Sequence, residues 1–376
     1  MQPVYKNVGE CIETQRKDFK IQTNQYLPTG VIPVIDQGAD FIGGYIDDPG
    51  KAYTGPLPVI VFGDHTCCLK YVSVQFAVGA DGTQLIRPNS DFDVRYFYYA
   101  LRAQKMEHFG YQRHFKLLKT KEVPWFPLST QRKIASILSA NDDLIENNLR
   151  RIKILEEMVQ NLYREWFVKF RFPGHQHARF TDSPLGRVPE RWEVVKVGDI
   201  LKKVKRGTKI QKQDYAAEGL IPVVDQGKGF IGGYTDNTES LISYDLPLII
   251  FGDHTRVLKF IDFPFACGAD GTQLLKSDDE RMPMTLFYYA LLSIDLSDFA
   301  YARHFKFLKE EPLVLPAKSI ADLFDQFVSP LRDQTRSLMK KNTTLRRTRD
   351  LLLPRLISGE VDVSELDITV PEEVAA

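Results

Sequence analysis

The chain repeats itself at a constant distance, and this internal repeat constrains the fold more than any other feature. Residues 31–86 match residues 220–275 at 31 of 56 ungapped positions, with each matched pair 189 residues apart. After a one-residue insertion the spacing becomes 190, so that Arg113-His114-Phe115-Lys116 matches residues 303–306. Each copy covers about 110 residues, which is an ordinary domain size. The period is too long for a solenoid and therefore indicates a duplicated domain.

Each copy contains short β-branched and aromatic runs that glycine interrupts, such as Val59-Ile60-Val61-Phe62 before Gly63-Asp64. Runs of this kind predict strands and turns. Residues 92–106 and 285–295 predict one helix in each copy. We therefore expect two α+β domains, each with a β-rich core.

A long apolar pattern follows each copy. From Thr130 to Trp166, and again from Ile320 to Leu352, apolar residues recur at steps of three, four and seven. This spacing predicts the a/d seam of a coiled coil, with helices of roughly 50 Å. Thr335 and Asn342 fall on the second seam, where polar residues can set the register at a cost in stability. Because both helices belong to one chain, we expect them to pair with each other.

The predicted order is domain, helix, linker, domain, helix and tail. Prolines and glycine after the first helix mark the linker. The predicted segments are 1–126 (first repeated domain), 127–172 (central helix), 173–192 (linker), 193–315 (second repeated domain), 316–357 (distal helix) and 358–376 (acidic tail).

The net charge of zero conceals strongly charged segments. The chain has 49 Lys and Arg against 49 Asp and Glu, whereas nucleic-acid-binding domains are usually basic. Residues 332–355 are basic, however, and residues 356–376 carry only acidic charges. Further basic stretches lie at 102–121 and 193–212, in or beside the repeated domains. The balance therefore excludes only a free-standing, non-specific DNA binder.

Membrane and metal classes are not favoured. No apolar run approaches the roughly 18 residues of a membrane span, and the first residues lack the charged flank and apolar core of a signal peptide. None of the four cysteines is shared between the copies, so neither a zinc site nor a disulfide belongs to the common fold. We predict a reducing, cytoplasmic location and no membrane contact.

The most enzyme-like motif is Asp64-His65-Thr66, repeated as Asp253-His254-Thr255. An Asp-His pair could serve a metal or acid–base chemistry. A third ligand at metal spacing is missing from the sequence, as are the nucleophile-elbow, Walker and dinucleotide motifs. We predict no catalytic residue and no metal site here, but a ligand-contact loop or an aspartate that caps a turn.

Two further repeated motifs each have two interpretations. Gly79 to Leu85, repeated at 268–274, could cradle a phosphate through backbone amides or form a tight hairpin turn at Asp81-Gly82. Gln37 and its copy Gln226 follow an apolar strand, and each could bond adenine bidentately or hold a turn.

The segment Arg113-His114-Phe115-Lys116, followed by Lys119, concentrates positive charge around an aromatic residue. Arginine and lysine meet phosphates and guanine edges, and the aromatic can anchor the segment. Because the cluster recurs in both copies while flanking charges do not, we predict DNA contact rather than a solvated turn. The candidate DNA contacts are Gln37, His65, Gln84, Arg113, His114, Lys116, Lys119, Gln226, His254, Gln273, Arg303, His304, Lys306 and Lys309.

This organisation resembles the specificity (S) subunit of type I restriction–modification systems. The resemblance covers essentially the whole chain and rests on two domains alternating with two long helices, and on the helix-end segments 163–170 and 351–360. Residues 127–134, which include Gln131, are similar to the family's proline-led start of the first helix. Pro316-Ala317-Lys318-Ser319-Ile320 departs from that pattern and lacks the glutamine.

The resemblance implies a non-catalytic subunit that recognises double-stranded DNA at a bipartite site. It implies two helices packed as an antiparallel spacer, two modification (methyltransferase) subunits docked along them, and restriction/translocase subunits that join the complex. S-adenosylmethionine, ATP and Mg²⁺ would belong to those partners, with no cofactor in this subunit, in a bacterial or archaeal cytoplasm. The similarity of the two domains adds the prediction of an interrupted near-palindrome.

Two alternatives remain open at this point. The first is a duplicated stand-alone hydrolase or nuclease that uses the Asp-His-Thr triplets. The second is a coiled-coil adaptor whose duplicated domains bind protein.

Overall fold

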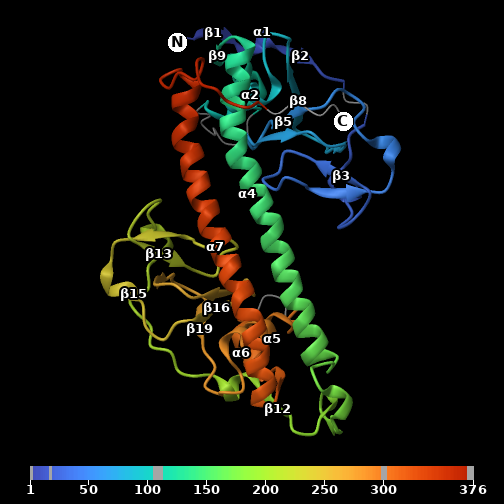
Figure 1. Ribbon diagram of the computed structural model, residues 1–376, viewed down its shortest axis with the longest axis vertical. Helices are drawn as coiled ribbons and strands as arrows, with labels where there is room; N and C mark the ends of the chain where they lie inside the picture. Colours follow the sequence, from blue (N-terminus) through green and yellow to red (C-terminus); the bar gives the residue numbers. More distant parts are fainter. Residues whose placement is uncertain (1–2, 17–18, 105–112, 298–302, 371–376) are drawn as a thin grey trace. The chain divides into compact units, whose positions relative to one another are not determined.

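The computed structural model describes residues 3–16, 19–104, 113–297 and 303–370 and divides the chain into two compact units (Figure 1). Unit 1 comprises residues 1–149 and 340–376, and unit 2 comprises residues 150–339. Each unit contains one copy of the repeat and part of each long helix. The division between the units thus falls inside the long helices.

Unit 1 is built around three small sheets. Their strand orders are β2-β8-β5-β6, β4-β3-β7 and β1-β9, and the central strand β5 is buried at every residue. The strands are β1 (Val4–Asn7), β2 (Ile12–Thr14), β3 (Ile32–Ile35), β4 (Gly44–Ile46), β5 (Val59–Gly63), β6 (Leu69–Val72), β7 (Ala77–Val78), β8 (Thr83–Pro88) and β9 (Glu122–Trp125).

Short helices complete this domain: α1 (Val8–Cys11), α2 (Val94–Arg102), α3 (Phe115–Lys119), η1 (Thr23–Gln25) and η2 (Pro49–Lys51). The helix α2 begins after Asp93, whose Oδ1 accepts a hydrogen bond from the backbone N of Tyr96 at 2.8 Å. The predicted helix at 92–106 is therefore confirmed over its central part. Residues 105 and 106 lie outside the described residues.

Unit 2 repeats this arrangement, with strand orders β17-β16-β19, β14-β13-β18-β15 and β12-β20. Its strands are β12 (Glu193–Lys196), β13 (Ile221–Val224), β14 (Gly233–Thr235), β15 (Leu241–Ile242), β16 (Leu248–Gly252), β17 (Leu258–Ile261), β18 (Phe265–Cys267), β19 (Thr272–Leu275) and β20 (Pro312–Leu315). Its short helices are α5 (Met284–Leu292), α6 (His304–Glu310), η5 (Val197–Ile200), η6 (Lys212–Asp214) and η7 (Thr238–Ser240). Both units are α+β, as predicted.

The segment expected to be a linker, residues 173–192, is folded. It contains η4 (His175–His177) and a hairpin of β10 (Phe180–Ser183) and β11 (Gly186–Pro189). The ring of Trp192 lies 5.7 Å from that of Phe167 and 4.9 Å from that of Phe172. This aromatic contact joins the segment to the core of unit 2.

The two long helices match the periodic pattern. They are α4 (Leu128–Tyr163), which continues as the π-helical segment η3 (Arg164–Val168), and α7 (Lys318–Ile357). The predicted seam residues are largely buried: Ile134, Leu138, Ile145, Ile152, Leu155, Val159 and Trp166 on α4 and η3, and Phe324, Val328 and Leu338 on α7. Burial of this stripe drives the packing of an amphipathic helix.

Within each unit the two helix segments run antiparallel. In unit 1, Asn148 Nδ2 donates to Asn342 Oδ1 at 2.8 Å, and the earlier Asp142 forms an ion pair with the later Arg349. Partner numbers therefore fall along α7 as residue numbers rise along α4. In unit 2, Ile152 and Leu155 pack with Leu338, while Trp166 and Phe167 pack with Phe324. The predicted antiparallel pairing holds in both units.

The starts of the two long helices differ, as the sequence indicates. Gln131 is fully buried, and its Oε1 accepts from the backbone N of Asp93 at 2.8 Å while its Nε2 donates to two backbone carbonyls. The equivalent position on α7, 190 residues further along the chain, is the buried Ala321, which has no amide. There the hydroxyl of Thr285 donates to Asp325 instead. Each unit thus joins its domain to its helix by a different polar contact.

None of the helices in the described part of the chain is long and apolar enough to cross a membrane.

Candidate nucleic-acid interface

The Asp-His-Thr triplet follows β5 and holds the start of α3. Asp64 is buried, and its Oδ1 accepts a hydrogen bond from the backbone N of Phe115 at 2.8 Å. Its backbone oxygen accepts from the N of His114, also at 2.8 Å. In unit 2, Asp253 accepts from the N of Phe305 at 2.8 Å in the same way. The aspartate is a cap, as one interpretation predicted, but it caps a helix about fifty residues further along the chain.

The histidines of the basic motif lie inside the domains. His114 is 2% exposed and His304 is 5% exposed. Their Nδ1 atoms lie 3.0 and 2.9 Å from the backbone oxygens of Asp64 and Asp253. Both imidazoles therefore stabilise the junction between the strand and the short helix. They are not part of the exposed surface of the motif.

The cations of the motif face outward. Arg113, Lys116 and Lys119 are exposed in unit 1, as are Arg303 and Lys306 in unit 2, where Lys309 is half-buried. Lys119 Nζ lies 4.7 Å from the ring centroid of Phe115, and Lys309 Nζ lies 5.3 Å from that of Phe305. The aromatic residue thus anchors the helix, as predicted, while the charges remain available to a polyanion.

The end of the short helix lies close to a glycine that both copies share, in Val8-Gly9 and Val197-Gly198. A Cβ atom on Gly9 would lie 3.0 Å from the carbonyl oxygen of Lys119, and one on Gly198 would lie 3.0 Å from that of Lys309. A larger residue would push this helix away from α1 or η5.

Gln37 connects three loops. Its Nε2 donates to the carbonyl of Asp81 at 2.9 Å, and its Oε1 accepts from the backbone N of His65 at 3.2 Å. Its backbone oxygen accepts from the hydroxyl of Thr66 at 2.5 Å. Gln226 makes the same three contacts at 2.9, 3.1 and 2.6 Å. The glutamine therefore holds a turn and, in doing so, gathers the loops after β3 and β5 with the one before β8.

The Asp81-Gly82 turn is tight, with φ angles of 42° and 79°. A Cβ atom on Gly82 would lie 2.6 Å from Gln37 Oε1 and 2.8 Å from His65 Cδ2, so only glycine fits. The turn connects β7 to β8, which belong to different sheets, and it is therefore not the hairpin that the sequence suggested. The carbonyl of Gly82 accepts from the backbone N of Asp64 at 2.7 Å.

The two remaining glutamine candidates differ between the units. Gln84 Nε2 lies 3.5 Å from Asp64 Oδ2. Gln273 Oε1 instead accepts from Arg206 Nη2 at 2.5 Å. Since Arg206 belongs to the basic stretch 193–212, that stretch reaches this site in unit 2.

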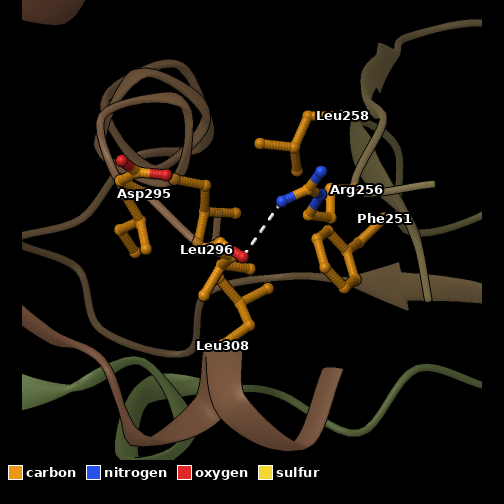
Figure 2. A pocket seen from close by; sticks show the side chains of 8 residues that line it. Phe251, Arg256, Leu258, Asp295, Leu296 and Leu308 are labelled. Carbon is orange, nitrogen blue, oxygen red and sulfur yellow. Dashed lines mark hydrogen bonds between the residues drawn. The ribbon is translucent and has the colours of Figure 1, made fainter. Parts of the chain in front are cut away.

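Another difference lies in the turn after β5 and β16. Cys67 of unit 1 corresponds to Arg256 of unit 2, and both adopt a left-handed conformation, with φ of 56° and 61°. The guanidinium of Arg256 donates to the carbonyl of Leu296 at 3.0 Å, in a pocket lined by Phe251 and Leu308 (Figure 2). This contact ties the turn of unit 2 to the segment after α5.

Motif reasoning missed one structural residue of the site. Lys70 is 5% exposed, and its Nζ donates to the carbonyls of Asp36 at 2.8 Å and Asp40 at 2.5 Å. Burial lowers the pKa of Lys70, and the nearby carboxylate of Asp36 opposes that shift. Lys259 makes equivalent contacts with Asp225 and Gly229. The signal was present in the sequence, because this lysine is identical in both copies.

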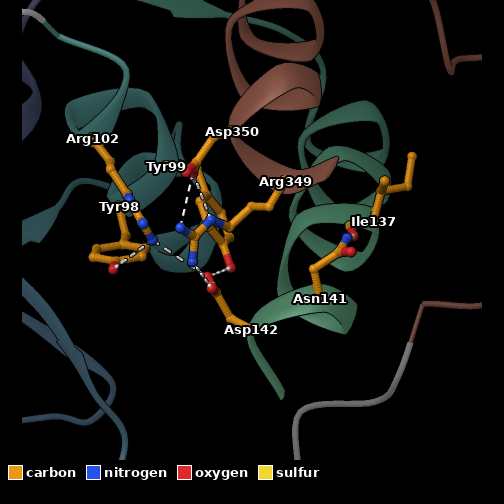
Figure 3. A network of polar contacts seen from close by, with 8 residues as sticks. All are labelled: Tyr98, Tyr99, Arg102, Ile137, Asn141, Asp142, Arg349 and Asp350. Atoms are coloured by element: carbon orange, nitrogen blue, oxygen red, sulfur yellow. Dashed lines mark hydrogen bonds and ion pairs between the residues drawn. The ribbon is translucent and has the colours of Figure 1, made fainter. Parts of the chain in front are cut away.

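A polar network attaches the recognition domain to the long helices of unit 1 (Figure 3). The hydroxyl of Tyr99 on α2 donates to Asp142 Oδ2 on α4 at 2.8 Å. Arg349 on α7 pairs with the same aspartate and with Asp350. In unit 2, the guanidinium of Arg332 on α7 lies 3.6 Å from the ring centroid of Phe260 instead.

Among the described residues, no group of three or more His, Cys, Asp or Glu side chains could hold a metal ion. The polar groups at the strand ends are largely bonded to one another, while the basic motif adds exposed cations and the neighbouring loops expose the carboxylates of Asp40, Asp81 and Asp270.

The family described as the type I restriction modification DNA specificity domain matches residues 4–157. The MjaIX type I restriction enzyme specificity subunit of Methanocaldococcus jannaschii is 27% identical over 316 residues, which cover 76% of this chain and 73% of that protein. The EcoR124I/EcoR124II specificity subunit of Escherichia coli is 30% identical over 128 residues, 33% of this chain and 31% of that protein.

Among solved structures, the S subunit of a type I restriction–modification system from M. genitalium has the same fold. It superposes with a TM-score of 0.59 at 18% identity, and the match covers 95% of this chain and 99% of that one.

Proposed function

We propose that this chain, which belongs to the family of type I restriction–modification specificity subunits, reads a two-part DNA site with one part assigned to each unit. As a member of that family it is a DNA-recognition component and not an enzyme.

One observation carries the proposal: both units hold the same arrangement at the ends of the same strands. The bond that caps the short helix measures 2.8 Å for Asp64 and 2.8 Å for Asp253. The bond from the glutamine side chain to the following turn measures 2.9 Å for Gln37 and 2.9 Å for Gln226. Two frameworks this similar are suited to similar half-sites, so the target is an interrupted near-palindrome.

The exposed cations supply the phosphate contacts. In unit 1 these cations are Arg113, Lys116 and Lys119. In unit 2 they are Arg303, Lys306 and the half-buried Lys309. Contacts to phosphate position a protein on DNA, while base edges carry the sequence information. His65 and Gln84 lie beside this cation cluster and are the candidate base contacts, with His254 and Gln273 in unit 2.

Partner subunits supply the chemistry. Two modification subunits that bind S-adenosylmethionine dock along the long helices, and restriction/translocase subunits that use ATP and Mg²⁺ complete the complex. The chain itself holds no cofactor and works in the cytoplasm of its bacterium or archaeon. Support for this arrangement comes from the family and from the length of α4 and α7.

The hydrolase alternative assigns chemistry to the Asp-His-Thr triplets, but the carboxylates of Asp64 and Asp253 already cap α3 and α6. The adaptor alternative does not explain why both units carry the same cluster of exposed cations. DNA recognition accounts for both the capping aspartates and the exposed cations on the helices that they cap.

The test is to express the chain with its modification subunits and to map the methylated positions in the host genome. We expect one interrupted motif whose two halves are nearly inverted copies. A motif with two unrelated halves would refute the near-palindrome, and methylation without a defined motif would refute the proposed reading itself.

A further inference from the structure

An exposed apolar pair stands at the same place in both units. Phe41 is 48% exposed and Ile42 is 37% exposed, and their copies Phe230 and Ile231 are 39% and 38% exposed. Each pair lies in the loop that joins β3 to β4, or β13 to β14. We call these pairs the apolar tips. Exposed apolar side chains are common singly, but an identical pair kept in two copies of a domain needs an explanation.

The loop that carries each apolar tip is held in place by hydrogen bonds. Lys70 donates to the carbonyl of Asp40, immediately before the tip, and to that of Asp36 at the end of β3. Asp36 Oδ1 accepts from the backbone N of Gly38 at 2.8 Å. The N of Gly43 donates to the carbonyl of Val34 at 2.9 Å and closes the loop after the tip. A loop held in this way presents its apolar groups without a large ordering cost on binding.

Equivalent hydrogen bonds hold the loop of unit 2. Lys259 donates to the carbonyls of Asp225 at 2.7 Å and Gly229 at 2.5 Å, and the N of Gly232 donates to the carbonyl of Val223 at 2.9 Å. In this unit the ring of Phe230 also lies 6.0 Å from that of Phe263. Phe230 nevertheless remains more than one third exposed.

The apolar tips belong to the candidate interface. The loop that carries Phe41 also carries Gln37, which connects it to the loops of Thr66 and Asp81. The tip therefore lies at the same end of the strands as the candidate base contacts. Val31 and Leu220, which are also exposed, precede β3 and β13 and lie at the opposite ends of those strands.

We propose that the two apolar tips contact the bases of the DNA, one tip for each half-site. Apolar side chains contact thymine methyl groups or the faces of bases, and they do not neutralise phosphate. The tips would thus add affinity that does not depend on salt, beside the salt-dependent contribution of the cation clusters. This inference rests on the proposed function, because it assigns the tips to the same DNA site.

The experiment measures DNA affinity of the complex with modification subunits at several salt concentrations, on a labelled duplex that carries the mapped motif. Phe41→Ala/Ile42→Ala and Phe230→Ala/Ile231→Ala should each weaken binding about tenfold to a hundredfold. The slope of log affinity against log salt should not change, because no charge is removed. Phe41→Leu/Ile42→Val, which keeps the tip apolar, should retain most of the affinity.

The matched controls are Val31→Ala and Leu220→Ala, which remove exposed apolar groups at the far ends of the strands and should leave affinity unchanged. Thermal unfolding of each variant is measured as well, because Phe230→Ala also loses the contact with Phe263, and affinities are compared at a temperature at which every variant is folded. Unchanged affinity of the tip variants, or a reduced salt slope, would overturn the assignment. If the wild-type complex itself showed no preference for any motif, the proposed function would fail instead, so the two failures are distinguishable.

Discussion

At the residue scale, one buried carboxylate in each unit organises the interface. Asp64 and Asp253 join the end of a central strand to a short basic helix, so that motifs far apart in the sequence become one site. A capping acceptor of this kind satisfies a backbone N–H that would otherwise lack a partner at the helix start. In the proposed function the aspartate would therefore act on DNA indirectly, by holding Arg113 and Lys116, or their copies, in place.

Replacing this cap should affect stability and binding together. Asp64→Ala should lower the free energy of unfolding by about 1–2 kcal/mol, because the N–H of Phe115 loses its acceptor. DNA affinity of the assembled complex should fall as well, since the cations of α3 lose their support. Urea unfolding and DNA titration measure the two effects.

Asp64→Asn is the matched control, because its side-chain oxygen can still accept the hydrogen bond. It should retain most of both properties. If Asp64→Ala unfolded like the wild type but abolished DNA binding, the carboxylate would act directly and not as a cap.

At the element scale, the paired helices are not equivalent in the two units. Unit 1 buries the hydrogen-bonded pair Asn148 and Asn342, while the positions 190 residues away along the repeat, Leu338 and Ile152, pack in an apolar cluster in unit 2. A buried asparagine in a helix pair typically specifies register at a cost in stability. Thr335, the other polar seam residue, bonds the carbonyl of Leu331 on its own helix and cannot set register in this way.

The double variant Asn148→Leu/Asn342→Ile gives unit 1 the residues that unit 2 has at the equivalent positions. We expect the free energy of unfolding to rise by about 1–3 kcal/mol, because a buried polar pair is replaced by apolar packing. The single variant Asn342→Ile should be destabilised, since the amide of Asn148 is then buried without its partner. Urea denaturation of the three proteins measures these differences, and a double variant less stable than the wild type would contradict the stability cost assigned to the asparagine pair.

At the scale of the whole molecule, the proposed function has two similar interfaces that act on one DNA. Their cation clusters account for a DNA-binding function in a chain whose net charge is zero. The charges of Arg113 and Arg303 stand in separate units, so their contributions to binding should be independent.

Arg113→Ala and Arg303→Ala should therefore each weaken DNA binding by a similar factor and lower the salt slope by about one. The double variant should multiply the two losses and lower the slope by about two. Affinity measured across a salt series tests this, with Lys153→Ala on α4 as a control that should leave the slope unchanged. If the double variant bound DNA no more weakly than either single variant, only one unit would contact the phosphates.

Local sequence patterns were sufficient to predict the two domains and the long helices. The 189-residue offset predicts two like domains, and the seam from Ile134 to Trp166 predicts a long helix, because a repeat and a helical period are both legible along the chain without any tertiary contact. The same reasoning predicted the exposed cations of the basic motif. It misjudged residues 173–192, whose aromatic Trp192 packs on a core that the local pattern does not reveal.

Tertiary contacts assigned the roles within each motif. Neighbours in the sequence, His114 and Lys116 point to opposite environments, because the imidazole meets the backbone of Asp64 while the lysine meets solvent. Gln37 holds a turn because Asp81 and His65 fold back onto it from 44 and 28 residues away. Such pairings depend on which strands lie side by side, so they emerge only when the chain is folded. The duplication was therefore evident from the residues alone, whereas the geometry of the candidate interface in each domain was not.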